Sequence, residues 1–154
     1  MPLPVAGLDA GWYDGCDFGH LADDYESRTG DIRDQTPQDL EGFDAVVHLA
    51  FIILGAEDEA RNVNLEGSRN VFEATLRAKV PRLIYTSSVA AYGFHDDNPE
   101  LLDETVPPRG SEEHYYSAQK AEVEAMLDSL SRGSPTEVYV FRPCIVAGAE
   151  ATEL

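Results

Sequence analysis

Tyr116 and Lys120 stand four residues apart in a segment whose sequence is typical of a helix. Side chains at that spacing project from one helix face, so the phenol and the ammonium can meet at one reacting centre. An ammonium that close stabilises a phenolate, which suits the tyrosine to act as a general acid or base. Ser88, at the end of an apolar segment earlier in the chain, could hold a substrate hydroxyl or carbonyl against the phenol. This set favours proton transfer coupled to hydride transfer.

The spacing alone is weak evidence, because a tyrosine and a lysine four residues apart often form an ordinary amphipathic pair. Two observations strengthen it. Lys120 is one of only two lysines, the other being Lys79. Apolar segments that end in small residues precede the pair at residues 44–50 and 82–93. From about Val5 to Gly148, the order of these pieces resembles the extended short-chain dehydrogenase/reductase family, also called the NAD-dependent epimerase/dehydratase family.

The resemblance implies a role for each residue of the candidate catalytic set. Tyr116 would be the acid/base, and Lys120 would bind the nicotinamide ribose while stabilising the phenolate. Ser88 would polarise the substrate. Asn64, on the helix expected after residues 44–49, would support a proton relay.

The same resemblance implies an NAD site, with NADP less favoured. Asp9 would accept hydrogen bonds from the adenosine ribose hydroxyls and disfavour a 2′-phosphate. Phe51 stands where the family usually has a small residue. The other implied contacts are Asp31 and Ile32 with adenine, Leu49 and Ala50 along the dinucleotide, Asn64, Tyr116 and Lys120 at the nicotinamide end, and Pro143 near the nicotinamide.

The start of the chain allows two interpretations. The favoured one makes residues 4–9 the second strand of such a domain. It predicts that the first strand, the glycine-rich loop and the first helix are lacking, and that the C-terminal substrate lobe is also absent. The chain would then be a partial NAD(P)-binding domain over residues 1–154, the middle of a longer enzyme. The alternative makes Val5 to Leu8 the first strand and places the phosphate loop at Gly11, Gly15 and Gly19, with Asp14 and Asp17 where a pyrophosphate would lie.

Alternating strands and helices predict a parallel α/β sheet, and the resemblance implies a Rossmann-like, doubly wound one. Strands are expected at 4–9, 25–29, 44–49, 82–87 and 136–142, and helices at 58–78 and 115–131, with a short helix starting at Thr36-Pro37. The acidic, proline-containing segment 93–113 is either a substrate loop or lid, or a solvated surface loop.

Composition excludes several classes of partner. The net charge of -18 would repel nucleic acid and anionic membrane, and no stretch approaches the roughly 18 apolar residues of a membrane span. Cys16 and Cys144 lack metal-ligand spacing and are expected to be reduced, as in a cytoplasmic protein. His48 is expected near the cofactor cleft, and the histidines at 20, 95 and 114 in exposed loops.

Two functions therefore remain open. The first is an NAD-dependent oxidoreductase or epimerase acting on a sugar nucleotide or another small hydroxyl or carbonyl substrate, in an assembly that could be a homodimer. The second is a non-catalytic, truncated remnant of such an enzyme that cannot hold cofactor.

Overall fold

Five short parallel strands form the sheets of the computed structural model, which describes residues 4–10, 26–53 and 57–148. The strands are β1 (Ala6–Asp9), β2 (Glu26–Thr29), β3 (Ala45–His48), β4 (Arg82–Thr86) and β5 (Glu137–Phe141). β1 pairs with β2, while β4 lies between β3 and β5 in a second sheet. Each strand lies within its predicted range, so these predictions are confirmed.

Alternation along β4 explains where the core lies. Side chains of a strand point to opposite faces in turn, and in β4 the buried ones are Leu83 and Tyr85. They pack with Phe72, Val123 and Leu127, which are contributed by helices. The core therefore lies between one face of the three-stranded sheet and the helices that cover it.

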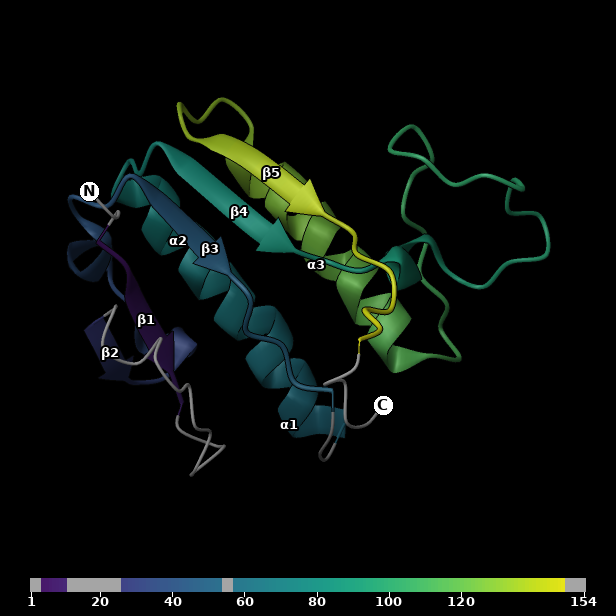
Figure 1. Ribbon diagram of the computed structural model, residues 1–154, viewed down its shortest axis with the longest axis horizontal. Helices are drawn as coiled ribbons and strands as arrows, with labels where there is room; N and C mark the ends of the chain where they lie inside the picture. Colours follow the sequence, from purple (N-terminus) through teal and green to yellow (C-terminus); the bar gives the residue numbers. More distant parts are fainter. Residues whose placement is uncertain (1–3, 11–25, 54–56, 149–154) are drawn as a thin grey trace.

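Two long helical elements form that cover (Figure 1). The first runs through α1 (Glu57–Asn62), a π-helical segment (Val63–Gly67) and α2 (Ser68–Arg77), and the second is α3 (Tyr115–Ser131). The predicted helices at 58–78 and 115–131 are confirmed, although the π-helical segment was not foreseen. π-Bulges inside helices often occur at functional sites.

A short 3-10 helix (Pro37–Leu40) follows β2, where a short helix was predicted. Its start is capped, since the Asp39 carboxylate accepts a hydrogen bond of 2.8 Å from the Thr36 N–H. The preceding turn packs on the first long helix, because a Cβ added at Gly67 would lie only 2.5 Å from the Ile32 side chain. Glycine at that position permits the close approach.

The two sheets do not pair with each other. In the described part of the chain β1 pairs only with β2, and β3 pairs only with β4. Figure 1 shows β1 and β2 set apart from the other three strands. The architecture is Rossmann-like, with parallel strands and helices. The alternative phosphate loop at Gly11, Gly15 and Gly19, with Asp14 and Asp17, lies outside the described residues.

The long segment between β4 and α3 extends away from the sheet (Figure 1). It begins after a 3-10 helix (Val89–Tyr92, called η5) and is fastened at both ends. Tyr92 donates its phenol hydrogen to the Asp103 carbonyl at 2.8 Å, and the Gly110 N–H donates to the Ala91 carbonyl at 2.9 Å. An ion pair of 2.8 Å between Arg109 and Asp97 crosses it. No helix of the described residues is long and apolar enough to cross a membrane.

Candidate active site

Tyr116 and Lys120 lie in the first turns of α3, beside the carboxyl end of β4. The Lys120 ammonium is 3% exposed and donates a hydrogen bond of 2.9 Å to the carbonyl oxygen of Thr86. It lies 5.7 Å from the centre of the Tyr116 ring. Burial lowers the pKa of Lys120 to about 8, and the Glu124 carboxylate acts in the opposite direction. The structure thus brings the predicted pair together.

Three aromatic rings surround this ammonium. The centre of the Phe51 ring is 3.8 Å from Lys120 Nζ, and that of Tyr85 is 5.1 Å away. Phe51 also meets the Tyr116 ring edge to face, with 5.4 Å between ring centres. Burial raises the pKa of Tyr85, so its phenol stays un-ionised. Phe51 was noted in the sequence only as an unusual residue, and its contact with Lys120 was not foreseen.

Asn64 lies in the π-helical segment and is completely buried. Its side-chain oxygen accepts from the Ile52 N–H at 2.7 Å, and its side-chain nitrogen donates to the Ile52 carbonyl at 2.9 Å. The same nitrogen donates to the side chain of Gln119, the neighbour of Lys120, at 2.8 Å. Asn64 therefore connects the segment after β3 to α3, while its part in a proton relay stays a prediction.

Ser88 begins η5, which packs on α3. Its hydroxyl oxygen accepts a hydrogen bond of 3.1 Å from the Ala90 N–H. Ser117 fastens η5 to α3 by donating to the Ala90 carbonyl at 2.6 Å. This places Ser88 on the element next to the helix that carries Tyr116, at the carboxyl end of β4.

A buried ion pair behind Lys120 was missed in the sequence. Both oxygens of Glu124, which is 7% exposed, accept hydrogen bonds from the Arg142 guanidinium at 2.6 to 3.1 Å. Arg142 also donates to the Tyr92 phenol at 2.9 Å, and Ser87 donates to Glu124. The pair joins α3, β4, β5 and η5. The available signal was the position of Glu124, one helical turn after Lys120.

The residues expected at the adenosine end lie at the carboxyl ends of β1 and β2. Asp9 is exposed there. Asp31 is paired with Arg33, whose Nε lies 3.0 Å from each carboxylate oxygen, and this contact lowers the pKa of Asp31. Ile32 is half-buried against Gly67. The structure does not bring these residues into contact with Tyr116 or Lys120.

Leu49 and Ala50, expected along the dinucleotide, are exposed just after β3, with Leu49 at 66%. Pro143 is exposed beyond β5, and its carbonyl accepts from the Val89 N–H at 3.2 Å. The set fits a dinucleotide lying across the carboxyl edge of parallel strands, where ligands of such sheets bind.

His48 is buried at the end of β3, beside the Tyr85 ring that lies near Lys120. Its Nε2 is 2.9 Å from the Ser68 hydroxyl, and its ring stacks on Tyr85. Burial, assisted by the charge of Lys120, lowers the pKa of His48 to about 4, so the ring is neutral.

One prediction about other side chains needs correction, and one is confirmed. His95 is half-buried rather than exposed, because its Nε2 contacts the Gly110 carbonyl at 2.6 Å. His114 is exposed as expected. Cys144 is an exposed free thiol at the point where the chain leaves the sheet after β5. His20 and Cys16 lie outside the described residues, within which no group of three or more His, Cys, Asp or Glu could hold a metal ion.

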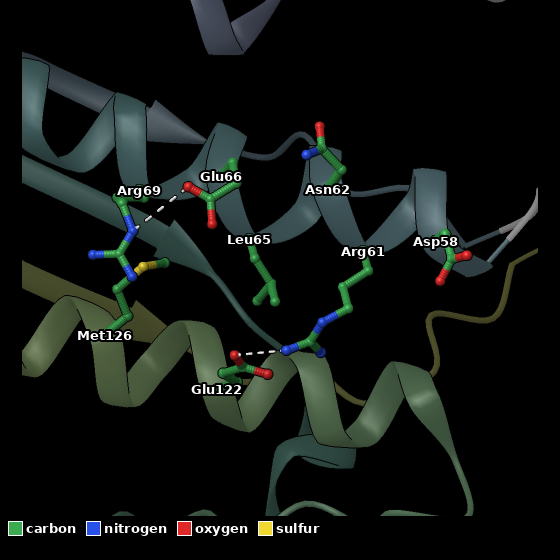
Figure 2. Close-up of a pocket in the computed structure, with 8 residues that line it drawn as sticks. All are labelled: Asp58, Arg61, Asn62, Leu65, Glu66, Arg69, Glu122 and Met126. Carbon is green, nitrogen blue, oxygen red and sulfur yellow. Dashed lines mark hydrogen bonds and ion pairs between the residues drawn. The ribbon is translucent and has the colours of Figure 1, made fainter.

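A groove of about 300 Å³ lies elsewhere, between the first long helix and α3 (Figure 2). An ion pair of 3.0 Å from Arg61 to Glu122 crosses it, and Arg69 faces Glu66 beside it. Tyr116 and Lys120 do not line it. The groove is therefore separate from the candidate catalytic pair.

Comparisons with known proteins identify the family of the chain. A model of the NAD dependent epimerase/dehydratase family matches residues 14–153. The N-acetyl-alpha-D-glucosaminyl-diphospho-ditrans,octacis-undecaprenol 4-epimerase of Escherichia coli O157:H7 is 35% identical over 134 residues, covering 79% of this chain and 38% of its own length. The UDP-glucose 4-epimerase of Yersinia pestis is 32% identical over 119 residues, covering 71% of this chain and 34% of its own length.

Solved structures give the same result. A UDP-glucose 4-epimerase superposes with a TM-score of 0.74 at 27% identity, over 96% of this chain and 46% of that one. A short-chain dehydrogenase/reductase superfamily protein from Agrobacterium tumefaciens with bound NAD gives 0.69 at 25% identity, over 90% of this chain and 40% of that one. The chain spans between a third and two fifths of the length of the two curated epimerases.

Proposed function

Because this chain belongs to the NAD-dependent epimerase/dehydratase family, we propose that it forms the cofactor-binding and proton-transfer part of an enzyme that oxidises or epimerises a hydroxyl-bearing carbon. A sugar nucleotide is the favoured substrate, as in the UDP-glucose 4-epimerase of Yersinia pestis. The observation that carries the proposal is the convergence of Lys120 Nζ and the Tyr116 ring, 5.7 Å apart, at the carboxyl edge of the strands.

In the proposed reaction, Tyr116 takes the proton of the substrate hydroxyl and can return it to the carbonyl oxygen. Bound NAD would supply the hydride acceptor and donor. Lys120, with a pKa of about 8, is mostly protonated at neutral pH and stabilises the phenolate. Ser88 orients the substrate oxygen from the neighbouring element, provided that its hydroxyl turns from Ala90 toward the substrate.

The residues that would hold NAD divide between the two ends of the site. Asp9 would accept hydrogen bonds from the adenosine ribose, and Asp31 and Ile32 would border the adenine. Leu49 and Ala50 would pack along the dinucleotide. At the other end, Lys120 would donate to the nicotinamide ribose, with Asn64, Tyr116 and Pro143 nearby.

Substitution of Tyr116 tests the function in the enzyme as it occurs in its source, with UDP-glucose as the probe substrate. Tyr116→Phe should abolish turnover and leave NAD binding within a few-fold, because it removes a proton carrier and little contact area. Lys120→Met should reduce both. Tyr139→Phe is the matched control, since Tyr139 on β5 is 45% exposed and its phenol hydrogen is donated to the Glu137 carboxylate. Substantial turnover by Tyr116→Phe would refute the proposed role.

The second candidate function is that of a non-catalytic remnant that cannot hold cofactor. It is favoured by the separation of the strands into two sheets. Within the described residues no strand connects β1 to β3, so the adenosine and nicotinamide ends lie on separate sheets. A chain of net charge -18 also repels a pyrophosphate unless backbone N–H groups cradle it. The 154-residue chain alone would then hold NAD weakly or not at all. Calorimetry at millimolar NAD decides between the two, because micromolar binding would rule out the second.

A further inference from the structure

Phe51 covers one side of the Lys120 ammonium. The distance of 3.8 Å from Lys120 Nζ to the ring centre is well within the limit of about 6 Å for a cation–π interaction. On another side, Nζ donates its hydrogen bond of 2.9 Å to the Thr86 carbonyl. The ammonium is thus held between a carbonyl oxygen and the face of an aromatic ring.

The position of Phe51 is built into the fold. The next residue, Ile52, has both its N–H and its carbonyl bonded to the buried side chain of Asn64. The residue after that, Ile53, accepts a hydrogen bond from the phenol of Tyr115 at the start of α3. The short segment that carries Phe51 is therefore fastened to both long helices.

We propose that Phe51 is a positioning residue of the candidate active site, whose ring holds the Lys120 side chain as an ammonium between the Thr86 carbonyl and the Tyr116 ring. Burial alone would favour the neutral amine. The negative face of an aromatic ring favours the cation and offsets part of that effect. The inference concerns the state of Lys120 itself and rests on the proposed function only for its consequence in catalysis.

Ionisable groups from α3, β3 and β4 surround Lys120. Glu124 on α3 favours the ammonium, although its two oxygens are already bonded to Arg142, which follows β5. His48 of β3 is neutral above a pH of about 4. Tyr85 of β4 stays protonated. The Tyr116 phenol of α3, whose ring centre lies 5.7 Å from Nζ, is removed by Tyr116→Phe.

The test measures the titration of Lys120 directly, and the 154-residue chain suits it because Lys79 is the only other lysine. The protein carries Tyr116→Phe and 13C-labelled lysine. The Cε chemical shift of each lysine is followed from about pH 6 to about pH 11, a range that includes the usual lysine pKa of about 10.4. Lys79 is exposed and serves as the internal reference.

Phe51→Leu keeps apolar cover but removes the ring, so the pKa of Lys120 should fall by about half a unit or more. Phe51→Tyr keeps the ring, so the pKa of Lys120 should stay at the value found with phenylalanine at this position. If Phe51→Leu does not fold, Phe51→Met carries the same expectation, because it also conserves apolar volume without a ring.

An unchanged or raised pKa of Lys120 in the folded Leu or Met variant would overturn the proposal, since ordinary packing would then account for Phe51. This outcome is distinct from failure of the proposed function. The lysine titration needs neither cofactor nor substrate, whereas the proposed function is judged by the turnover of Tyr116→Phe.

Discussion

The buried side-chain amide of Asn64 forms two hydrogen bonds with the backbone of Ile52. It thereby satisfies the N–H and the carbonyl that a neighbouring strand would otherwise satisfy. The distances are 2.7 Å to the Ile52 N–H and 2.9 Å to its carbonyl. Because the π-helical segment turns Asn64 inward, the chain leaving β3 is fixed where it passes Lys120. Asn64 therefore has a structural task beside any role in proton relay.

Replacement of Asn64 by leucine should destabilise the fold. It leaves two backbone groups of Ile52 without their partner, and an unsatisfied buried group costs about 1–3 kcal/mol. We expect the free energy of unfolding, measured with urea, to fall by about 2 kcal/mol. Asn62→Ala is the control, because the side chain of exposed Asn62 accepts a hydrogen bond from the Arg33 guanidinium. Its loss should change stability by less than about 0.5 kcal/mol. Equal effects of the two substitutions would contradict the prediction.

Loss of Arg142 should be more damaging than loss of an exposed arginine. Arg142→Met leaves the Glu124 carboxylate, 6% exposed at its side chain, without its ionic partner, and breaking a buried pair costs about 3–5 kcal/mol. Arg132→Met provides the comparison, since its pair with Asp128 is exposed at 76% and 68% and should contribute at most about 1 kcal/mol. Adding Glu124→Gln to Arg142→Met should recover part of the loss. Urea unfolding of all three variants would measure these differences.

His48 should make the fold sensitive to acid. Its pKa is lowered from 6.5 to about 4, so below pH 6.5 the unfolded chain binds a proton that the folded chain does not. Stability from this group is complete above pH 6.5 and is lost as the pH falls toward 4, by on the order of 3 kcal/mol. His48→Phe should flatten the dependence of unfolding free energy on pH within that window. An unchanged slope would show that other groups cause it.

Asp9 should set the preference between cofactors if the chain binds them. A carboxylate at the end of β1 can accept ribose hydroxyls and repels a 2′-phosphate. Fluorescence titration should therefore give tighter binding of NADH than of NADPH, and Asp9→Asn should narrow the difference. Asp44→Asn, at the opposite end of the sheet before β3, should leave the preference unchanged. Tighter binding of NADPH by the unaltered chain would refute this assignment.

Local sequence patterns determined much of the fold. Apolar segments bounded by small or polar residues predicted β1, β3, β4 and β5, whereas β2 is polar and exposed. Residues Tyr115–Ser131 form the helix expected at 115–131. The proximity of Tyr116 and Lys120 was predictable for the same reason, since it follows from the period of a single helix. Such features depend on residues close in sequence and need no knowledge of how the elements pack.

The environment of Lys120 was decided only by the tertiary structure. Phe51, Thr86 and Tyr85 reach the ammonium from other elements, as Arg142 reaches Glu124 from beyond β5. Asn64 is buried within a π-helical segment, which no residue type in the sequence predicted. Burial, and with it the protonation of Lys120 and His48, depends on what several elements exclude together. The sequence thus determined which chemical groups share a helix face, and packing decided which groups surround them and in what charge state.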